Sequence, residues 1–313
     1  LRAGLTSDHF SSGLGFEFGA RSRDFGWRPQ TDEQVRDWYG RWINLAVQFA
    51  SGDSEHARSA KAILGRSIRF LWGSTNTDDL LRQAAEDLSA GRGWPEGWLG
   101  VRQTLYYRRT KLDHASKEAL REIEAILAPP DLEAEVRARV LASNGPCIDY
   151  EEPEDGDDSV SDRLRRAESA IEQLGYQAAG DQRLIACLLP ELLASPSSSA
   201  TFYFGHGVGL ADAGVPETLS VCRSFLETRE PHEASLIFVR GIISGWTKST
   251  PAPAVEFLDR ALEDEVWLQW FVELQVQSKL DPSAYERLLT AAAANRCPVG
   301  QFFYLGTGRN TDA

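Results

Sequence analysis

The sequence predicts an all-α protein, with a helical repeat in its C-terminal half and an irregular helical N-terminal half. Two observations carry this prediction. Apolar residues recur at intervals of three and four along the first half, and aromatic clusters recur every 33 or 34 residues along the second. With 313 residues, 42% of them hydrophobic, the chain is long enough to bury a substantial core.

The helices expected in the first half follow from the faces that their apolar residues form. A further helix is expected from Asp131 to about Leu141, after Pro129 and Pro130, because proline is well tolerated before or within a first helical turn. Four more helices are expected, each from a set of apolar residues that would share one helical face: Val35, Trp38, Trp42, Leu45 and Phe49; Ala57, Ala60, Leu64, Ile68 and Leu71; Leu81, Ala84, Ala85 and Leu88; and Leu120, Ile123 and Leu127.

An acidic stretch separates the two halves. Residues 149–158 carry seven acids in ten positions together with a proline and a glycine, a composition that repels itself and has nothing to bury. The favoured interpretation is a solvated spacer, and an acidic docking tail or cation site is the alternative. We therefore expect an N-terminal helical region over residues 1–143, an acidic loop or linker over 144–160, and a helical-repeat region over 161–313.

The repeat is set by aromatic clusters that end at Phe204, Phe238, Phe271 and Tyr304, which are 34, 33 and 33 residues apart. An amphipathic segment that begins with proline lies between each pair of clusters. A unit of about 33 residues that alternates such a segment with a more apolar one is typical of helix pairs of the HEAT or TPR kind, stacked as an α-solenoid. The sequence predicts about four such pairs.

The prolines mark where the amphipathic helices should begin. Pro216, Pro253 and Pro282 each precede an amphipathic run, and Asp281 is the expected N-cap of the last one. The more apolar elements are ambiguous, because the apolar residues of 265–280 also alternate as a strand would. The length of that run without Gly or Pro favours helix pairs, and alternating β/α units stay open.

The glycine-rich stretch 203–214, YFGHGVGLADAG, could cradle a phosphate or present a catalytic histidine. The repeat places His206 opposite Arg240, Glu273 and Gly306, and it places valine or leucine opposite some of the neighbouring glycines. A pyrophosphate loop needs its glycines, whereas closely packed elements accept small apolar residues. The stretch is therefore expected to be a close-packed inner element. An α/β nucleotide-binding enzyme that uses these glycines is the rival prediction.

Residues 93–111 mix aromatic and basic side chains. Such a mixture occurs on surfaces that bind single-stranded nucleic acid, where rings stack on bases and cations contact phosphates. The favoured interpretation, however, is a turn held by two buried indoles, with arginines that cap or solvate a helix, and the single-strand surface is the alternative. The candidate interaction residues here are Trp94, Trp98, Arg102, Arg108 and Arg109.

Charge and cysteine content exclude several classes of protein. The formal net charge is −13, yet Lys and Arg balance Asp and Glu over residues 1–143, so the acidity lies in the linker and the second half. This argues against a duplex-binding surface there. The four cysteines show no metal-ligand spacing and indicate reduced thiols of a cytoplasmic protein. No apolar run is long enough to predict a membrane span.

A family resemblance rests on FEFGARSRDFGWRPQT at residues 16–31 and on the GWPEGW and VRQTL segments after it. These blocks resemble the helical regions of large bacterial multidomain proteins, some of which join a STAND-type signalling NTPase to a helical repeat and are associated with defence. The resemblance covers about the first 140 residues, and the terminal QFFYLGTGRNTDA is similar to repeat endings in such regions. Its motifs are not catalytic, so it implies a role in sensing or protein interaction.

The expected function is a non-enzymatic protein-interaction, scaffold or sensor module that forms part of a larger bacterial protein. No catalytic, metal or cofactor residue is assigned, and no cofactor is expected. The expected partner is a protein, with single-stranded nucleic acid at residues 93–111 as the less favoured alternative and no membrane. The candidate recognition residues of the second half are His206, Arg240 and Glu273, if their shared place in the repeat faces outward.

Overall fold

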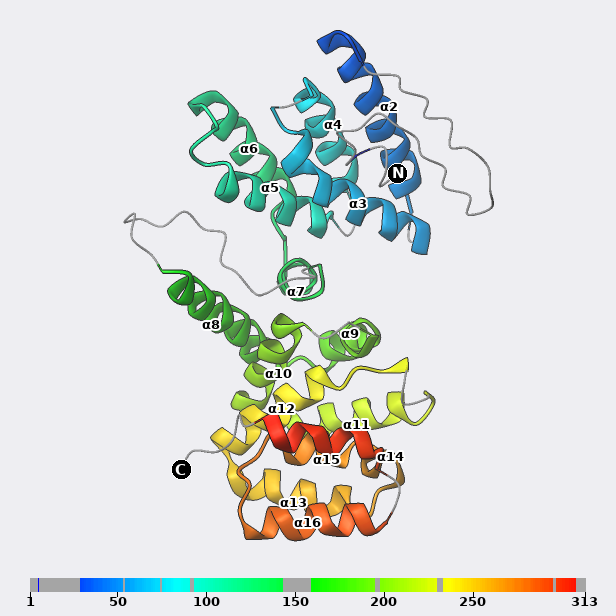
Figure 1. The fold of residues 1–313 in the computed structure, drawn as a ribbon, viewed down its shortest axis with the longest axis vertical. Coiled ribbons are helices and arrows are strands. Elements are labelled where there is room, and N and C mark those ends of the chain that lie inside the picture. The colour runs from blue at the N-terminus through cyan, green and yellow to red at the C-terminus, as the bar shows by residue number, and fades with distance from the viewer. Residues whose placement is uncertain are drawn as a thin grey trace, which may run out of the picture. The chain divides into compact units, whose positions relative to one another are not determined.

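The computed structural model is all-α over the residues that it describes, which confirms the predicted fold class (Figure 1). These residues contain fifteen α-helices and no strand, so the alternatives of β/α units and of an α/β nucleotide-binding fold are wrong for this part of the chain. The structure describes residue 5 and residues 29–52, 54–73, 75–90, 93–142, 159–194, 198–229, 233–294 and 297–307.

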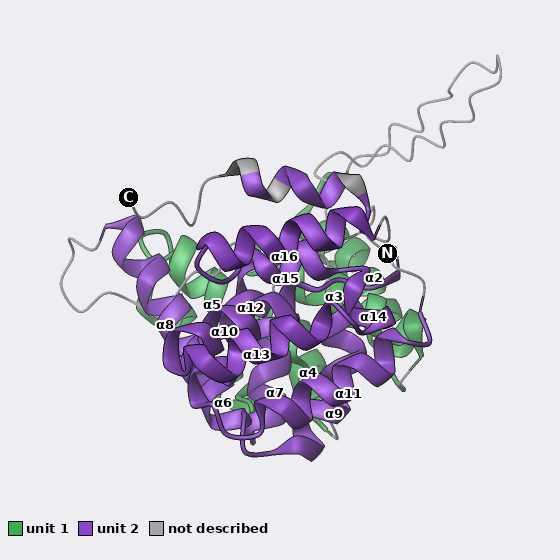
Figure 2. Ribbon diagram, turned by 90° about the horizontal axis from the view of Figure 1, so that it is seen from below, with its two compact units in different colours: residues 1–130, 150–152 green, residues 131–149, 153–313 purple. Residues whose placement is uncertain are grey.

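The chain divides into two compact units (Figure 2). The helices up to Pro130 belong to unit 1, and those from Asp131 onward belong to unit 2. The segment from Asp131 to Leu141, which the predicted domain boundaries place with the N-terminal region, contacts helices of unit 2. Most of the predicted linker, residues 144–158, lies outside the described part of the chain.

Unit 1 consists of two layers of helices. Helices α2, α4 and α6 pack side by side in one layer, α3 and α5 pack together in the other, and the layers meet where α2 contacts α3 and α5 contacts α6. The bounds are α2 Asp32–Ala50, α3 Glu55–Leu71, α4 Asp78–Ser89, α5 Pro95–Tyr107 and α6 His114–Leu127.

Side-chain caps fix where several of these helices begin. Thr31, Ser54 and Asp113 each accept a hydrogen bond from a backbone N–H in the first turn of α2, α3 and α6. Pro95 begins α5, where its missing N–H leaves no bond unmade. The apolar faces predicted for α3, α4 and α6 are all buried, so these three predictions are confirmed.

Helix α2 turns a different face to the core from the one predicted. Tyr39, Ile43, Ala46 and Ala50 are buried, whereas Phe49 from the predicted face is 50% exposed. The buried face includes Gly40, Ala46 and Ala50, whose small size lets neighbouring helices approach. A Cβ built on Gly40, for example, would lie only 3.1 Å from Leu80 Cδ1 of α4.

Unit 2 begins with a helix that changes from α to π geometry and continues from Val160 as a series of helices. Its helices are α7 Leu132–Val136, the π-helical η1 Arg137–Leu141, α8 Val160–Ala178, α9 Gln182–Ala194, α10 Ser199–Ala211, α11 Val215–Leu226, α12 Ile237–Ser249, α13 Pro251–Ala261, α14 Glu265–Leu268, α15 Phe271–Gln275, α16 Pro282–Ala293 and the 3-10 helix η3 Val299–Thr307.

Helix α10 lies between α8 and α12 and makes its most extensive contacts with these two (Figure 1). Three of the four aromatic residues that define the sequence repeat lie in the core of this region, and the side chain of the fourth, Tyr304, lies outside the described part of the structure. Phe204, Phe238 and Phe271 are fully buried, and the rings of Phe204 and Phe238 stack with centroids 5.9 Å apart. The sequence period therefore records which residues meet between successive inner helices.

Glycines allow the backbones of α8, α10 and α12 to touch. A Cβ on Gly205 or Gly209 would overlap backbone of α12, and a Cβ on Gly207 would overlap the carbonyl oxygen of Glu172 in α8. The contact is reciprocal, since a Cβ on Gly241 or Gly245 would overlap backbone of α10. The prediction that stretch 203–214 is a close-packed inner element is confirmed, and the contacts explain why its glycines are not available to a phosphate.

The run 265–280 is helical but broken, so the prediction of helix over strand is confirmed while an unbroken helix is wrong. Helices α14 and α15 are separated by a turn at residues 269–270. Trp267, Leu268, Trp270 and Phe271 are all buried on either side of this turn. One face of a regular helix cannot bury so many bulky side chains in succession, and the break redirects them.

The predicted start signals of the amphipathic helices are largely correct. Pro282 begins α16, and the Asp281 carboxylate accepts a hydrogen bond from the N–H of Ala284, which confirms the predicted cap. Pro216 lies in the first turn of α11. Helix α13 begins at Pro251, two residues earlier than Pro253 suggests.

We expect Gly207→Ala to destabilise unit 2, because the new methyl group must push α8 away from α10. The free energy of unfolding should fall by about 2–3 kcal/mol, in the upper part of the range for overpacked cores. Urea denaturation followed by circular dichroism measures the change. The matched control is Gly180→Ala, where a Cβ meets nothing within 4 Å. Equal stability of the two variants would contradict the close-packing argument.

Candidate functional site

The aromatic residues predicted at the start of segment 93–111 lie in the core of unit 1. Trp94 is buried and its Nε1 donates a hydrogen bond to the carbonyl of Lys61 at 3.0 Å. Trp98 is also buried, and Arg102 lies over its ring, with Cζ 4.7 Å from the centroid. The Arg102 guanidinium pairs with Glu124 of α6 at 3.8 Å. These three side chains hold α5 against its neighbours.

The arginines at the end of α5 occupy different environments. Arg108 donates hydrogen bonds to the carbonyls of Trp72 and Arg69, so it caps the C-terminal end of α3, where cations interact favourably with the helix dipole. Arg109 is exposed, and its Cζ lies 5.1 Å from the centroid of the Tyr106 ring. Of the predicted residues in this segment, Arg109 is thus the one that reaches solvent most fully.

His206 points from α10 toward α8. Its Nδ1 lies 2.7 Å from Oε2 of Glu172, its ring stacks on Phe202, and the residue is buried. A general base needs a positioned partner, and Glu172 supplies one. However, the described residues around this pair contain no nucleophile or second acid within hydrogen-bond distance of the imidazole. The pair joins two helices.

Arg240 and Glu273 form the equivalent pair two repeat units along the chain. The Arg240 guanidinium lies 3.9 Å from the Glu273 carboxylate, and both side chains are largely buried. Burial raises the pKa of Glu273, and the positive charge of Arg240 opposes the shift. His206, Arg240 and Glu273 occupy the same position of the repeat, and their side chains face a neighbouring inner helix more than solvent.

These four residues form what we call the inner polar row: Glu172, His206, Arg240 and Glu273. They lie 34, 34 and 33 residues apart, so Glu172 extends the repeat one unit toward the N-terminus. Sequence reasoning missed Glu172 because α8 has no aromatic cluster at the expected place. Counting 34 residues back from His206 would have found it.

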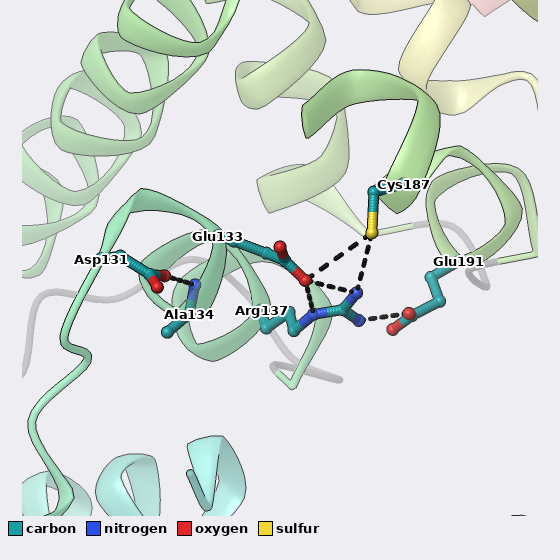
Figure 3. Close-up of polar contacts among 6 residues, drawn as sticks. All are labelled: Asp131, Glu133, Ala134, Arg137, Cys187 and Glu191. Carbon is teal, nitrogen blue, oxygen red and sulfur yellow. Dashed lines mark hydrogen bonds and ion pairs between the residues drawn. The ribbon is translucent and has the colours of Figure 1, made fainter. Parts of the chain in front are cut away.

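A second polar cluster, absent from the sequence predictions, joins α7 and η1 to α9 (Figure 3). Arg137 contacts Glu133 at 3.0 Å, pairs with Glu191, and has one guanidinium nitrogen 3.9 Å from the sulfur of Cys187. Burial disfavours the charged guanidinium, but the hydrogen bonds and charges of Glu191 and Glu133 outweigh it and raise the pKa of Arg137. Residues from three elements meet here, and their evident role is to hold α7 against α9.

The described cysteines differ in exposure. Cys187 is exposed, whereas Cys222 and Cys297 are buried free thiols. Burial raises the pKa of Cys222 to about 12 and also raises the pKa of Cys297. Since the thiolate is the reactive form, the two buried thiols are chemically inert at neutral pH.

The described ranges hold neither a candidate metal site nor a helix that could span a membrane. They contain no group of three or more His, Cys, Asp or Glu side chains placed to hold a metal ion. Among the described helices, none combines the length and apolar composition that crossing a membrane requires. Comparisons of the chain with protein-family models, with curated proteins and with solved structures found no match.

We expect Arg137→Gln to loosen α7 from α9, because the change removes the shared cation and leaves Glu133 and Glu191 facing each other. The free energy of unfolding should fall by about 1.5–3 kcal/mol, the range for hydrogen bonds to charged groups. Urea denaturation gives the measurement, with Arg165→Gln as the control, since Arg165 is 75% exposed and such pairs contribute little. A loss no larger than that of the control would refute the structural role.

We also expect thiol labelling to separate the cysteines. In a Cys147→Ser background at pH 8, Cys187 should react rapidly with a maleimide, while Cys222 and Cys297 should react at the rate of unfolding. Mass spectrometry of tryptic peptides measures each site, and labelling in urea provides the fully reactive reference. Rapid modification of Cys222 in the folded protein would contradict its burial and raised pKa.

Proposed function

We propose that the chain is a non-enzymatic protein-interaction or sensor module built on a helical repeat. In this interpretation residues 161–313 form an α-solenoid of four helix pairs of the HEAT or TPR kind. The support comes from contacts one repeat apart. Besides the inner polar row, Trp246 Nε1 donates to Asp212 Oδ1 at 2.7 Å and Gln301 donates to the carbonyl of Gln269 at 2.9 Å. The pairs would be α8 with α9, α10 with α11, α12 with α13, and α14–α15 with α16.

The observation that carries the proposal is the pairing within the inner polar row. His206 was the candidate for chemistry in the second half, and it is engaged by Glu172 of a neighbouring inner helix, as Arg240 is by Glu273. A stack held by such internal contacts leaves its exposed positions available to vary without cost to the core. Extended surfaces of this kind suit recognition of a protein partner better than catalysis.

Two sequence features agree with a role in sensing. The resemblance of the first half to helical regions of bacterial STAND-type signalling proteins favours a region of a larger protein that detects a signal. The free thiols at Cys187, Cys222 and Cys297 favour the cytoplasm, where thiols stay reduced. The sensing role and the cytoplasmic location are both parts of the proposal.

The proposal predicts that the purified chain turns over no substrate. We expect no hydrolysis of nucleoside triphosphates, esters or phosphodiesters above the buffer rate, and no difference between the wild-type chain and Glu172→Gln or His206→Ala. Turnover that disappears in His206→Ala while the helical circular dichroism spectrum is kept would overturn the proposal. The positive counterpart is saturable binding of a purified protein partner, measured by calorimetry at a fixed stoichiometry.

A further inference from the structure

We propose that unit 1 binds single-stranded nucleic acid on the outer face of its α3 and α5 layer. This surface differs from the one the sequence indicated, because Trp94, Trp98 and Arg102 are buried. It adds a nucleic-acid partner to the protein partner of the proposed function and does not depend on that proposal.

The fold of unit 1 separates positive from negative charge. Unit 1 is nearly neutral in sequence, but its two layers are not. Residues 55–71 and 95–111, which make α3, α5 and the turn after α5, carry eight Lys and Arg against two Asp and Glu. Helices α2, α4 and α6 together carry five against ten. One layer is therefore strongly cationic and the other anionic.

Four exposed arginines of the first layer have no carboxylate partner within the described part of the chain, whereas the buried Arg102 pairs with Glu124. Among the described residues, none of Arg58, Arg66, Arg69 and Arg109 forms an ion pair, although all four are exposed. Three of the four arginines in α2, α4 and α6 behave differently, and Arg41 is the exception. Arg36 pairs with Asp79, Arg82 with Glu122, and Arg121 with Glu118. When a polyanion such as a nucleic acid binds cations that have no carboxylate nearby, counterions are released, and this release favours binding.

Three of these cations form a track along one side of α3. With 3.6 residues per turn, Arg58, Arg66 and Arg69 fall within about 80° of one another around α3. They extend over about 16 Å of the helix, at 1.5 Å per residue. The track continues to the end of α5, because Arg69 lies over the Tyr107 ring at 5.0 Å and Arg108 donates to the Arg69 carbonyl.

Exposed aromatic rings favour a single strand over other polyanions. Two aromatic side chains are exposed beside the track, Phe70 at 38% and Tyr107 at 47%. Unpaired bases stack on such rings, whereas duplex bases are already stacked and an acidic peptide offers no flat partner. Exposed aromatic rings beside unpaired guanidinium groups are what binding proteins use for single strands without strong sequence preference.

Fluorescence anisotropy of the full chain with a labelled oligothymidylate of about 20 nucleotides tests the proposal. With about four phosphates contacted, the logarithm of the binding constant should fall with that of salt with a slope of about −3, or about 50-fold from 50 to 200 mM salt. Changing Arg66, Arg69 and Arg109 together to Gln should reduce the slope to about −1. Tyr107→Ala should weaken binding about fivefold or more while leaving the slope unchanged.

Matched variants control for general charge and folding effects. Arg41, Arg82 and Arg121 changed together to Gln remove three charges from the anionic layer, and Tyr176→Ala removes an exposed tyrosine from unit 2. Both should bind as the wild-type chain does, with an unchanged circular dichroism spectrum. No binding at 50 mM salt, or equal losses in the controls, would overturn the proposal. Equal competition by polyglutamate, together with no effect of Tyr107→Ala, would also overturn it and identify an acidic protein as the partner.

Discussion

The contact between helix backbones at glycine is the constraint on which unit 2 depends. Where α8, α10 and α12 meet, Gly205, Gly207 and Gly245 remove the side chains that ordinarily keep two helices 8–10 Å apart. The close approach allows weak Cα–H to carbonyl contacts, and it brings the polar residues beside the glycines within reach of the next helix. The contact of His206 with Glu172 and the stack of Phe204 on Phe238 lie across these same helices, so both need the spacing that the glycines set.

The sequence predicted the helices of this protein well because their signals are local. Capping residues such as Asp281, prolines at first turns, and apolar periodicity in α3 and α6 report interactions within a few residues, and the structure agrees with them. The period of 33 to 34 residues predicted a repeating helical unit, and two of its aromatic residues, Phe204 and Phe238, stack on each other. These features required no knowledge of the distant parts of the chain.

The predicted sites were less accurate, because exposure is a property of the whole fold. The favoured interpretation of Trp94 and Trp98 as buried indoles is confirmed, whereas their alternative role as exposed stacking rings is wrong. The face of α2 was misjudged for a related reason, since bulky residues suggest burial while small ones decide which side approaches a neighbour. The charge separation between the layers of unit 1 was invisible because oppositely charged helices alternate along the sequence and cancel in any count.

The reciprocal glycines of α10 and α12 also bear on how this protein can diverge. Gly205 and Gly209 face one helix, and Gly241 and Gly245 face back from it, each pair four residues apart. At these positions any larger residue must separate two backbones, while surface positions a few residues away can change freely. Evolution should therefore preserve the two glycine pairs and their 36-residue offset after most other identities are gone. Distant relatives would share a spacing before they share a sequence.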